Sequence, residues 1–182
     1  PINWNDLPHS GVQLKLDRSG GVTAFCGATE IGQGSDDVLV ACVAEVLGID
    51  PFDIRAVTGD TDLTPVDLGS YSSRVTLMMG NAAIQAAERA REMLAAAVST
   101  RIEVPKDRLV FAERRVFDSE DPEKGVTFQE AVCMAEAQFG TLGTTGSYTP
   151  PKSAARFKGG GVGPSPTYSY SAAVVEVEVD PE

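Results

Sequence analysis

Four aliphatic hydroxyl side chains crowd the start of a long run of small apolar residues. The stretch is DLGSYSSRVTLMMGNAA, residues 67–83. Its hydroxyl residues are Ser70, Ser72, Ser73 and Thr76. At a helix start, backbone N–H groups lack intrahelical partners and the dipole favours an anion, while Arg74 can add two parallel hydrogen bonds to phosphate. The stretch therefore fits a phosphate site, although a serine cap on a buried helix is the simpler interpretation.

A second candidate site lies in the segment GATEIGQGSDD, which leads directly into an expected helix. Gly32 and Gly34 would let a ligand approach the backbone on either side of the amide side chain of Gln33. The segment has neither the GK[ST] ending of a Walker loop nor the GxGxxG dinucleotide fingerprint. Because Asp36 and Asp37 would repel an anion, we expect amide and backbone contacts here. A plain tight turn is the alternative interpretation.

Two other polar segments carry weaker signals. Residues 157–172, FKGGGVGPSPTYSYSA, combine glycines with tyrosines that could reach a ligand, but a flexible loop has the same composition. Asp60, Asp62 and Asp67 lie in a turn-rich segment without histidine, and we interpret them as turn residues rather than proton-transfer groups. No catalytic residue is therefore assigned to this chain.

The histidine and cysteine content encodes no metal centre. His9 is the only histidine, and Cys26, Cys42 and Cys133 lack CxxC spacing. A zinc site needs clustered ligands, and a disulfide framework needs paired cysteines. We expect reduced core thiols and no metal ligands from the protein.

Composition and charge exclude several classes of partner. The 182 residues are 42% hydrophobic and carry a net charge of −11, with scattered acidic residues. This charge disfavours nucleic acid and anionic membrane surfaces as partners. The sequence has no apolar run near the ~20 residues of a membrane span and no signal-like start, so we expect a cytoplasmic protein.

The elements that would position these residues alternate between strands and helices. Alternating and helical spacings predict a hairpin over 12–28, helices over 35–47, 76–99 and 128–139, strands over 53–60 and 140–149, and one or two strands over 107–118. Ser35 and Thr127 are the expected caps of the first and last helix, and Gly48 the expected end of the first. The alanines and glycine of the long helix permit close backbone approach. The predicted class is α/β or α+β, a mixed sheet with packed helices.

The domain organisation is predicted to be one domain over 1–182, cut from a larger chain. The sequence starts without methionine, and its last residues, SAAVVEVEVDPE, form an alternating strand pattern that stops at a turn. We expect the hairpin partner of that strand outside the chain. Residues 149–168 have the proline and glycine content of a long loop.

The order of EIGQGS, helix, strand, DTDLTPVDLGSYSSR and a small-residue helix resembles the molybdenum-binding large subunit of the xanthine oxidase and aldehyde oxidoreductase family. The resemblance implies a molybdopterin-binding domain of the molybdenum hydroxylase type, in which these two motifs hold the cofactor. The implied cofactor-binding residues are Gly32, Gln33, Gly34, Ser70, Ser72, Ser73, Arg74, Thr76, Gly80 and Asn81.

The cofactor implied by the resemblance is molybdopterin cytosine dinucleotide with molybdenum. In this family the dithiolene sulfurs of the cofactor hold the metal, so protein ligands are not required. The resemblance also implies [2Fe-2S] clusters and FAD on other domains or subunits, within an oligomeric complex. We expect the excised domain alone to be inactive and to carry no cofactor, because much of the enclosing surface would come from other segments.

Among the branches of the family, LKLDRSGGVTAFCGATEIGQGS and LTPVDLGSYSSRVTLMMGNAA are most similar to 4-hydroxybenzoyl-CoA reductase. This implies reductive dehydroxylation of an aromatic acyl-CoA, and a small aromatic substrate carried as a coenzyme A thioester. One alternative is a hydroxylase of aldehydes or N-heterocycles. The alternative of another class is a non-catalytic assembly or binding domain with the same fold.

Two geometric expectations follow for the candidate site. Gln33 should lie beside the turn formed by residues 70–74, since both segments would converge on one cofactor. Arg74 should contact the phosphates or order the loop that does. Its rival role is a surface ion pair with Asp60, Asp62 or Asp67.

Overall fold

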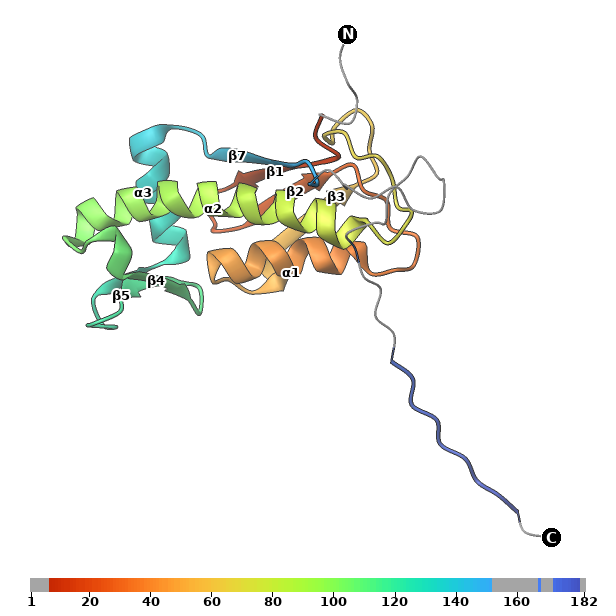
Figure 1. Ribbon diagram of the computed structural model, residues 1–182. Coiled ribbons are helices and arrows are strands. Elements are labelled where there is room, and N and C mark those ends of the chain that lie inside the picture. Colours follow the sequence, from red (N-terminus) through yellow and green to blue (C-terminus); the bar gives the residue numbers. More distant parts are fainter. Residues whose placement is uncertain (1–6, 152–166, 168–171, 181–182) are drawn as a thin grey trace.

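The computed structural model describes residues 7–151, 167 and 172–180 as a mixed α/β fold with two sheets and three α-helices (Figure 1). The predicted fold class is confirmed. The elements are β1 (Ser10–Leu16), β2 (Val22–Cys26), α1 (Ser35–Leu47), the 3-10 helix η2 (Pro51–Asp53), β3 (Ile54–Thr58), α2 (Val75–Ile102), the 3-10 helix η3 (Lys106–Arg108), β4 (Leu109–Ala112), β5 (Arg115–Asp118), β6 (Gly125–Thr127), α3 (Phe128–Phe139) and β7 (Gly143–Tyr148).

The main sheet has the strand order β3-β2-β1-β7. The predicted hairpin is confirmed: β1 and β2 are antiparallel, and Leu14 pairs with Ala24. β2 and β3 are parallel, which requires a crossover connection, and α1 supplies it. Because parallel neighbours end at the same edge, the loops that follow β2 and β3 leave the sheet side by side.

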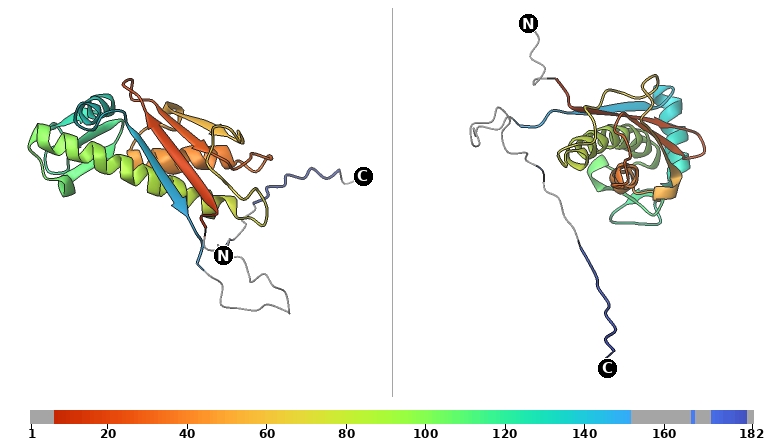
Figure 2. Two further views of the ribbon diagram at one scale, coloured as in Figure 1. Left: turned by 90° about the horizontal axis from the view of Figure 1, so that it is seen from above. Right: turned by 90° about the vertical axis from the view of Figure 1, so that its right-hand side faces the viewer.

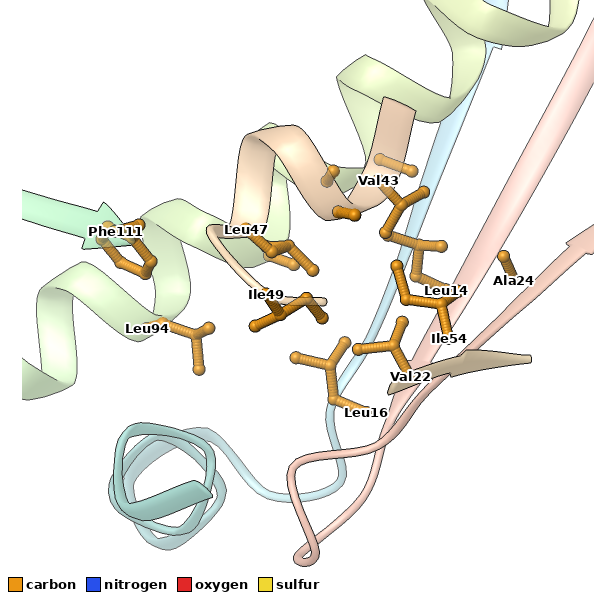
Figure 3. Close-up of a cluster of buried hydrophobic side chains, with 14 of the residues drawn as sticks. Leu14, Leu16, Val22, Ala24, Val43, Leu47, Ile49, Ile54, Leu94 and Phe111 are labelled. Carbon is orange, nitrogen blue, oxygen red and sulfur yellow. The ribbon is translucent and has the colours of Figure 1, made fainter. Parts of the chain in front are cut away.

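Helices α1 and α2 cover the same face of this sheet (Figure 2). Leucine and valine side chains from α1 and from the inward positions of the strands form one core, shown with its α2 neighbours in Figure 3. Alternate residues of β1, including Leu14 and Leu16, point into it, as do Val43 and Leu47 of α1. In β1 and α1 the buried residues therefore follow the period expected from the sequence.

The close backbone approach predicted for the long helix occurs where α2 crosses β7. Its alanines Ala82, Ala83, Ala86, Ala87 and Ala90 are buried. A Cβ atom on Gly146 would overlap the carbonyl oxygen of Ala82 and lie 2.6 Å from the backbone nitrogen of Ala86. The position of α2 on the sheet thus depends on a glycine.

A second, antiparallel sheet of order β4-β5-β6 and helix α3 pack near the C-terminal end of α2 (Figure 1). Residues 107–118 therefore form two strands, one of the two possibilities left open. The predicted cap of α3 is confirmed as a capping box, in which Thr127 Oγ1 accepts from Glu130 N and the Glu130 carboxylate accepts from Thr127 N.

One prediction about local structure is wrong. Ser35 is not the cap of α1 but its buried first helical residue, because Gly34 is the N-cap, in the left-handed conformation with φ 79°. Residues 172–180 form no strand, and their valine side chains are exposed. A strand needs a paired neighbour, and the expected hairpin partner lies outside the chain, so this strand stays a prediction.

Most of the predicted loop 149–168 lies outside the described residues, of which only 149–151 and 167 belong to it. None of the described helices has the length and apolar character needed to cross a membrane.

Changing Gly146 to alanine should destabilise the protein by about 1–3 kcal/mol, because the added methyl group would push α2 away from β7. Denaturant unfolding measures this effect. Gly143→Ala in the same strand is the matched control, since its Cβ would meet only Leu14 O at an ordinary 3.4 Å. Equal stabilities of the two variants would contradict the role assigned to Gly146.

Candidate cofactor-binding site

The two predicted motifs meet at one end of the fold. Residues 27–34 join β2 to α1, and residues 59–74 join β3 to α2. Both helices begin at this end of the molecule, so their N-termini and the two loops share one surface (Figure 1). In open α/β sheets, ligands bind outside the carboxyl ends of the strands, and this surface has that position.

Hydrogen bonds to a single carbonyl group join the two loops. Ser70 Oγ donates to Thr29 O at 2.6 Å, and Gln33 Nε2 donates to the same oxygen at 3.1 Å. The prediction that Gln33 lies beside the 70–74 turn is confirmed. Two segments that are distant in sequence therefore form one polar surface.

The amide of Gln33 holds its own loop in shape. Nε2 also donates to Ser35 Oγ at 2.9 Å, and Oε1 accepts from Ile31 N at 2.6 Å. Gly32 and Gly34 adopt positive φ of 97° and 79°, and a Cβ at either position would meet nothing within 4 Å. The glycines are therefore required by the turn conformation, and their outer sides are open to a ligand.

Glu30, which the sequence analysis did not single out, lies at the centre of this loop. Its carboxylate accepts hydrogen bonds from Gly32 N, Gly34 N, Ser35 Oγ and Asp36 N. Desolvation acts to raise the pKa of Glu30, but hydrogen bonds from backbone N–H groups of residues 32–36 together outweigh it and hold the pKa below its ordinary value. The sequence signal that could have pointed to Glu30 is an acidic residue four positions before a glycine at the helix N-cap.

Arg74 points into the protein. Its Nη1 donates to Asp67 Oδ1 at 3.2 Å and to Gly69 O at 2.7 Å, and its Nη2 donates to His9 O at 2.9 Å. The side chains of Arg74 and Asp67 are 5% and 0% exposed. Arg74 thus orders the loop, one of its two predicted roles. The rival ion pair exists with Asp67, but it is buried.

The start of α2 exposes hydroxyl groups. Ser72 and Ser73 have φ of 52° and 53°, in the left-handed region, and their residues are exposed, as is Thr76. Such conformations cost of order 1 kcal/mol each and cluster at functional sites. The N-cap residue of α2 is Arg74, and no side-chain hydrogen bond caps it in the described part of the chain. The simple serine cap is therefore not what is observed.

Three further residues of the predicted segments make contacts within the protein. Gly80 is buried, and a Cβ there would lie 3.6 Å from Cys42 Sγ, so this glycine faces α1. Asn81 Nδ2 donates to Leu77 O at 2.6 Å within the helix. Thr167, from the third predicted segment, donates through Oγ1 to Ser72 O at 3.3 Å. Gly80 thus contributes to helix packing, whereas Thr167 adjoins the exposed serines.

Two buried carboxylate oxygens near the loops have no hydrogen-bond partner among the described residues. They are Asp36 Oδ1 and Asp67 Oδ2. The other oxygens of these groups are bonded, Asp36 Oδ2 to Thr58 Oγ1 and Asp67 Oδ1 to Gly69 N. Buried acceptors without partners are rare and indicate a missing donor, from a ligand or from water.

Other parts of the molecule contain no better candidate for a ligand or metal site among the described residues. A cavity of about 730 Å³ lies at the C-terminal end of α1, lined by residues that include Gly48, Pro51 and Arg114, and it contains none of the predicted residues. In the described ranges, no group of three or more histidine, cysteine or acidic residues could hold a metal ion. The candidate site is therefore the surface formed by the two loops.

The chain is similar to known proteins in sequence and in fold. A family model described as the molybdopterin cofactor-binding domain matches residues 2–182. The chain is 33% identical over 151 residues to the probable hypoxanthine oxidase XdhD of Escherichia coli K12. This alignment covers 82% of the chain and 16% of that protein. It is 43% identical over 84 residues to subunit gamma of the 6-hydroxypseudooxynicotine dehydrogenase complex of Paenarthrobacter nicotinovorans, covering 44% and 11%.

Among solved structures, CO dehydrogenase from Oligotropha carboxidovorans resembles this fold with a TM-score of 0.71 at 27% identity, over 79% of this chain and 18% of that chain. The chain thus spans less than a fifth of the length of each of these relatives.

Changing Arg74 to alanine should destabilise the protein by about 3–5 kcal/mol, because it leaves the buried carboxylate of Asp67 unpaired. Denaturant unfolding checks this value. Arg101→Ala, at an exposed position in the last turn of the same helix, should change stability by less than about 0.5 kcal/mol. A similar small effect for both variants would show that the ion pair does not hold the loop.

Proposed function

Since the chain belongs to the molybdopterin cofactor-binding domain family, we propose that its two adjoining loops hold a molybdopterin cofactor in a larger molybdenum-dependent oxidoreductase subunit. The observation that carries this proposal is the convergence of Gln33 and Ser70 on the carbonyl oxygen of Thr29. It brings an amide-bearing loop and a hydroxyl-rich helix start onto one surface. When bound, the cofactor supplies two-electron redox chemistry at molybdenum.

The residues present fit such a group. The start of α2 offers backbone N–H groups that lack intrahelical partners, and the exposed residues Ser72, Ser73 and Thr76 carry hydroxyls of the kind that suit phosphate oxygens. The buried acceptors Asp36 Oδ1 and Asp67 Oδ2 lack donors within the part of the chain that the structure describes, and a pterin ring carries N–H donors. Arg74 supports the phosphate contacts indirectly, because its guanidinium fixes the preceding loop.

We further propose the cytosine dinucleotide form of the cofactor. Its pyrophosphate presents anionic oxygens on two linked phosphate groups instead of one, and α2 has no acidic residue in its first turn to oppose them. The relatives include a subunit of a dehydrogenase complex. By analogy we propose that partner subunits or domains carry [2Fe-2S] clusters and FAD and relay the electrons.

Two substrate classes are proposed. The resemblance of the segments around residues 14–35 and 63–83 supports reductive removal of a hydroxyl group from an aromatic acyl-CoA such as 4-hydroxybenzoyl-CoA. The name of the hypoxanthine oxidase relative supports the second class, hydroxylation of N-heterocycles or aldehydes. Assays of the full-length complex decide between them: hydroxyl loss from the thioester under reducing conditions supports the first, and oxidation of hypoxanthine or an aldehyde with an electron acceptor supports the second.

The cofactor assignment predicts that the full-length protein, purified with its partners, contains stoichiometric molybdenum and releases cytidine monophosphate on acid treatment. Elemental analysis and nucleotide chromatography measure both. A different nucleotide would overturn the cytosine form. Absence of both molybdenum and nucleotide would favour the non-catalytic assembly or binding domain.

A variant of Thr76 tests the position of the phosphate site. Thr76→Val removes one exposed hydroxyl from the first turn of α2 and should lower cofactor affinity about fivefold, the effect of one lost hydrogen bond near 1 kcal/mol. Molybdenum occupancy in limiting molybdate reports the change. Thr100→Val, at an exposed position near the other end of the helix, is the control. Equal occupancy in the two variants would remove Thr76 from the site.

A further inference from the structure

The carboxylate of Glu30 occupies a nest of backbone N–H groups on the Gln33 loop. Oε1 accepts from Gly32 N at 2.6 Å and from Gly34 N at 3.1 Å. Oε2 accepts from Asp36 N at 3.3 Å and from Ser35 Oγ at 3.4 Å. Successive N–H groups of this kind at a helix start are the donors that a bound phosphate usually takes. In this protein a side chain of the loop already holds them.

Glu30 also replaces the missing cap of α1. The N-cap residue Gly34 has no side chain, and no side-chain bond is made from that position. The Glu30 carboxylate satisfies N–H groups at the helix start and places a negative charge against the positive end of the helix dipole. The first turn adds Asp36 and Asp37, so this helix start is strongly acidic.

The same carboxylate is connected to Gln33 through hydrogen bonds. Ser35 Oγ contacts both Glu30 Oε2 and Gln33 Nε2, and Gln33 Nε2 reaches Thr29 O, which also accepts from Ser70. The bonds to Gly32 N and Gly34 N hold the residues on both sides of Gln33. The direction of the Gln33 amide therefore depends on the Glu30 carboxylate, although Glu30 makes no direct bond to it.

The two helix starts of the site differ in charge. The start of α2 has exposed hydroxyls and no acidic residue in its first turn, whereas the start of α1 has two, and Glu30 covers its N–H groups. We propose that Glu30 is a positioning residue, a built-in anion that shapes the Gln33 loop and withholds its N–H groups from phosphate. The inference rests on the proposed function and deepens it: the uncharged part of the cofactor lies against Gln33, and its phosphates lie at α2.

Hydrogen–deuterium exchange of peptide 30–37 in the full-length protein tests the positioning role. Glu30→Gln should speed exchange about tenfold, the loss expected for charge-assisted hydrogen bonds near 1.4 kcal/mol. Glu30→Asp, which keeps the charge on a shorter side chain, should give an intermediate rate. Asp37→Asn is the matched control, because it removes a charge from the same helix start but makes no hydrogen bond or ion pair among the described residues. Equal exchange in Glu30→Gln and the wild type would overturn the proposal.

Added inorganic phosphate tests the withholding of the N–H groups. Phosphate should slow the exchange of peptide 30–37 in Glu30→Gln but leave the wild type unchanged. Slowing in the wild type, or no slowing in the variant, would overturn this part. Both readouts are independent of molybdenum, so a wild-type protein that lacks the metal would refute the proposed function without deciding the role of Glu30. If the metal is present, Glu30→Gln should lower its occupancy and Asp37→Asn should not.

Discussion

The buried ion pair between Arg74 and Asp67 is the interaction on which the candidate site depends. Arg74 also donates to His9 O and Gly69 O, and Ser10 at the start of β1 forms a bridge with Asp67. Removing two charges from water is costly unless they are paired and hydrogen-bonded, so this geometry is strongly specified. It fixes the loop before α2 to the first strand of the sheet, and with it the place where the hydroxyl groups are exposed.

The second constraint is the parallel pairing of β2 and β3, which sends both connecting loops out at one edge of the sheet. Close contact of α2 with Gly146 then sets the helix against β7, so that α2 begins beside the loop that precedes α1. The contact of Ser70 and Gln33 with Thr29 O follows from this arrangement. Packing far from the site thus decides which polar groups share its surface.

The resulting surface is divided by charge. Its α1 side carries Glu30 and the two acidic residues of the first helical turn, while its α2 side carries hydroxyls and a first helical turn without acidic residues. A ligand with an anionic end and an uncharged, hydrogen-bonding end complements this division. In the proposed function, the protein supplies orientation and electrostatics, and the cofactor supplies the redox chemistry.

The sequence by itself determined the hairpin, the three helices, the capping box at Thr127 and the two motifs of the site, because these depend on residues close together in the chain. At residues 172–180 the alternating sequence pattern does not produce a strand in this structure, because a strand also requires a paired neighbour. Only the tertiary structure decided that Arg74 faces inward, since its partner His9 is 65 positions away. Tertiary structure also decided that the carboxylate of Glu30, and not the hydroxyl of Ser35, accepts the N–H groups at the start of α1. The path of the turn selects which side chain reaches those N–H groups.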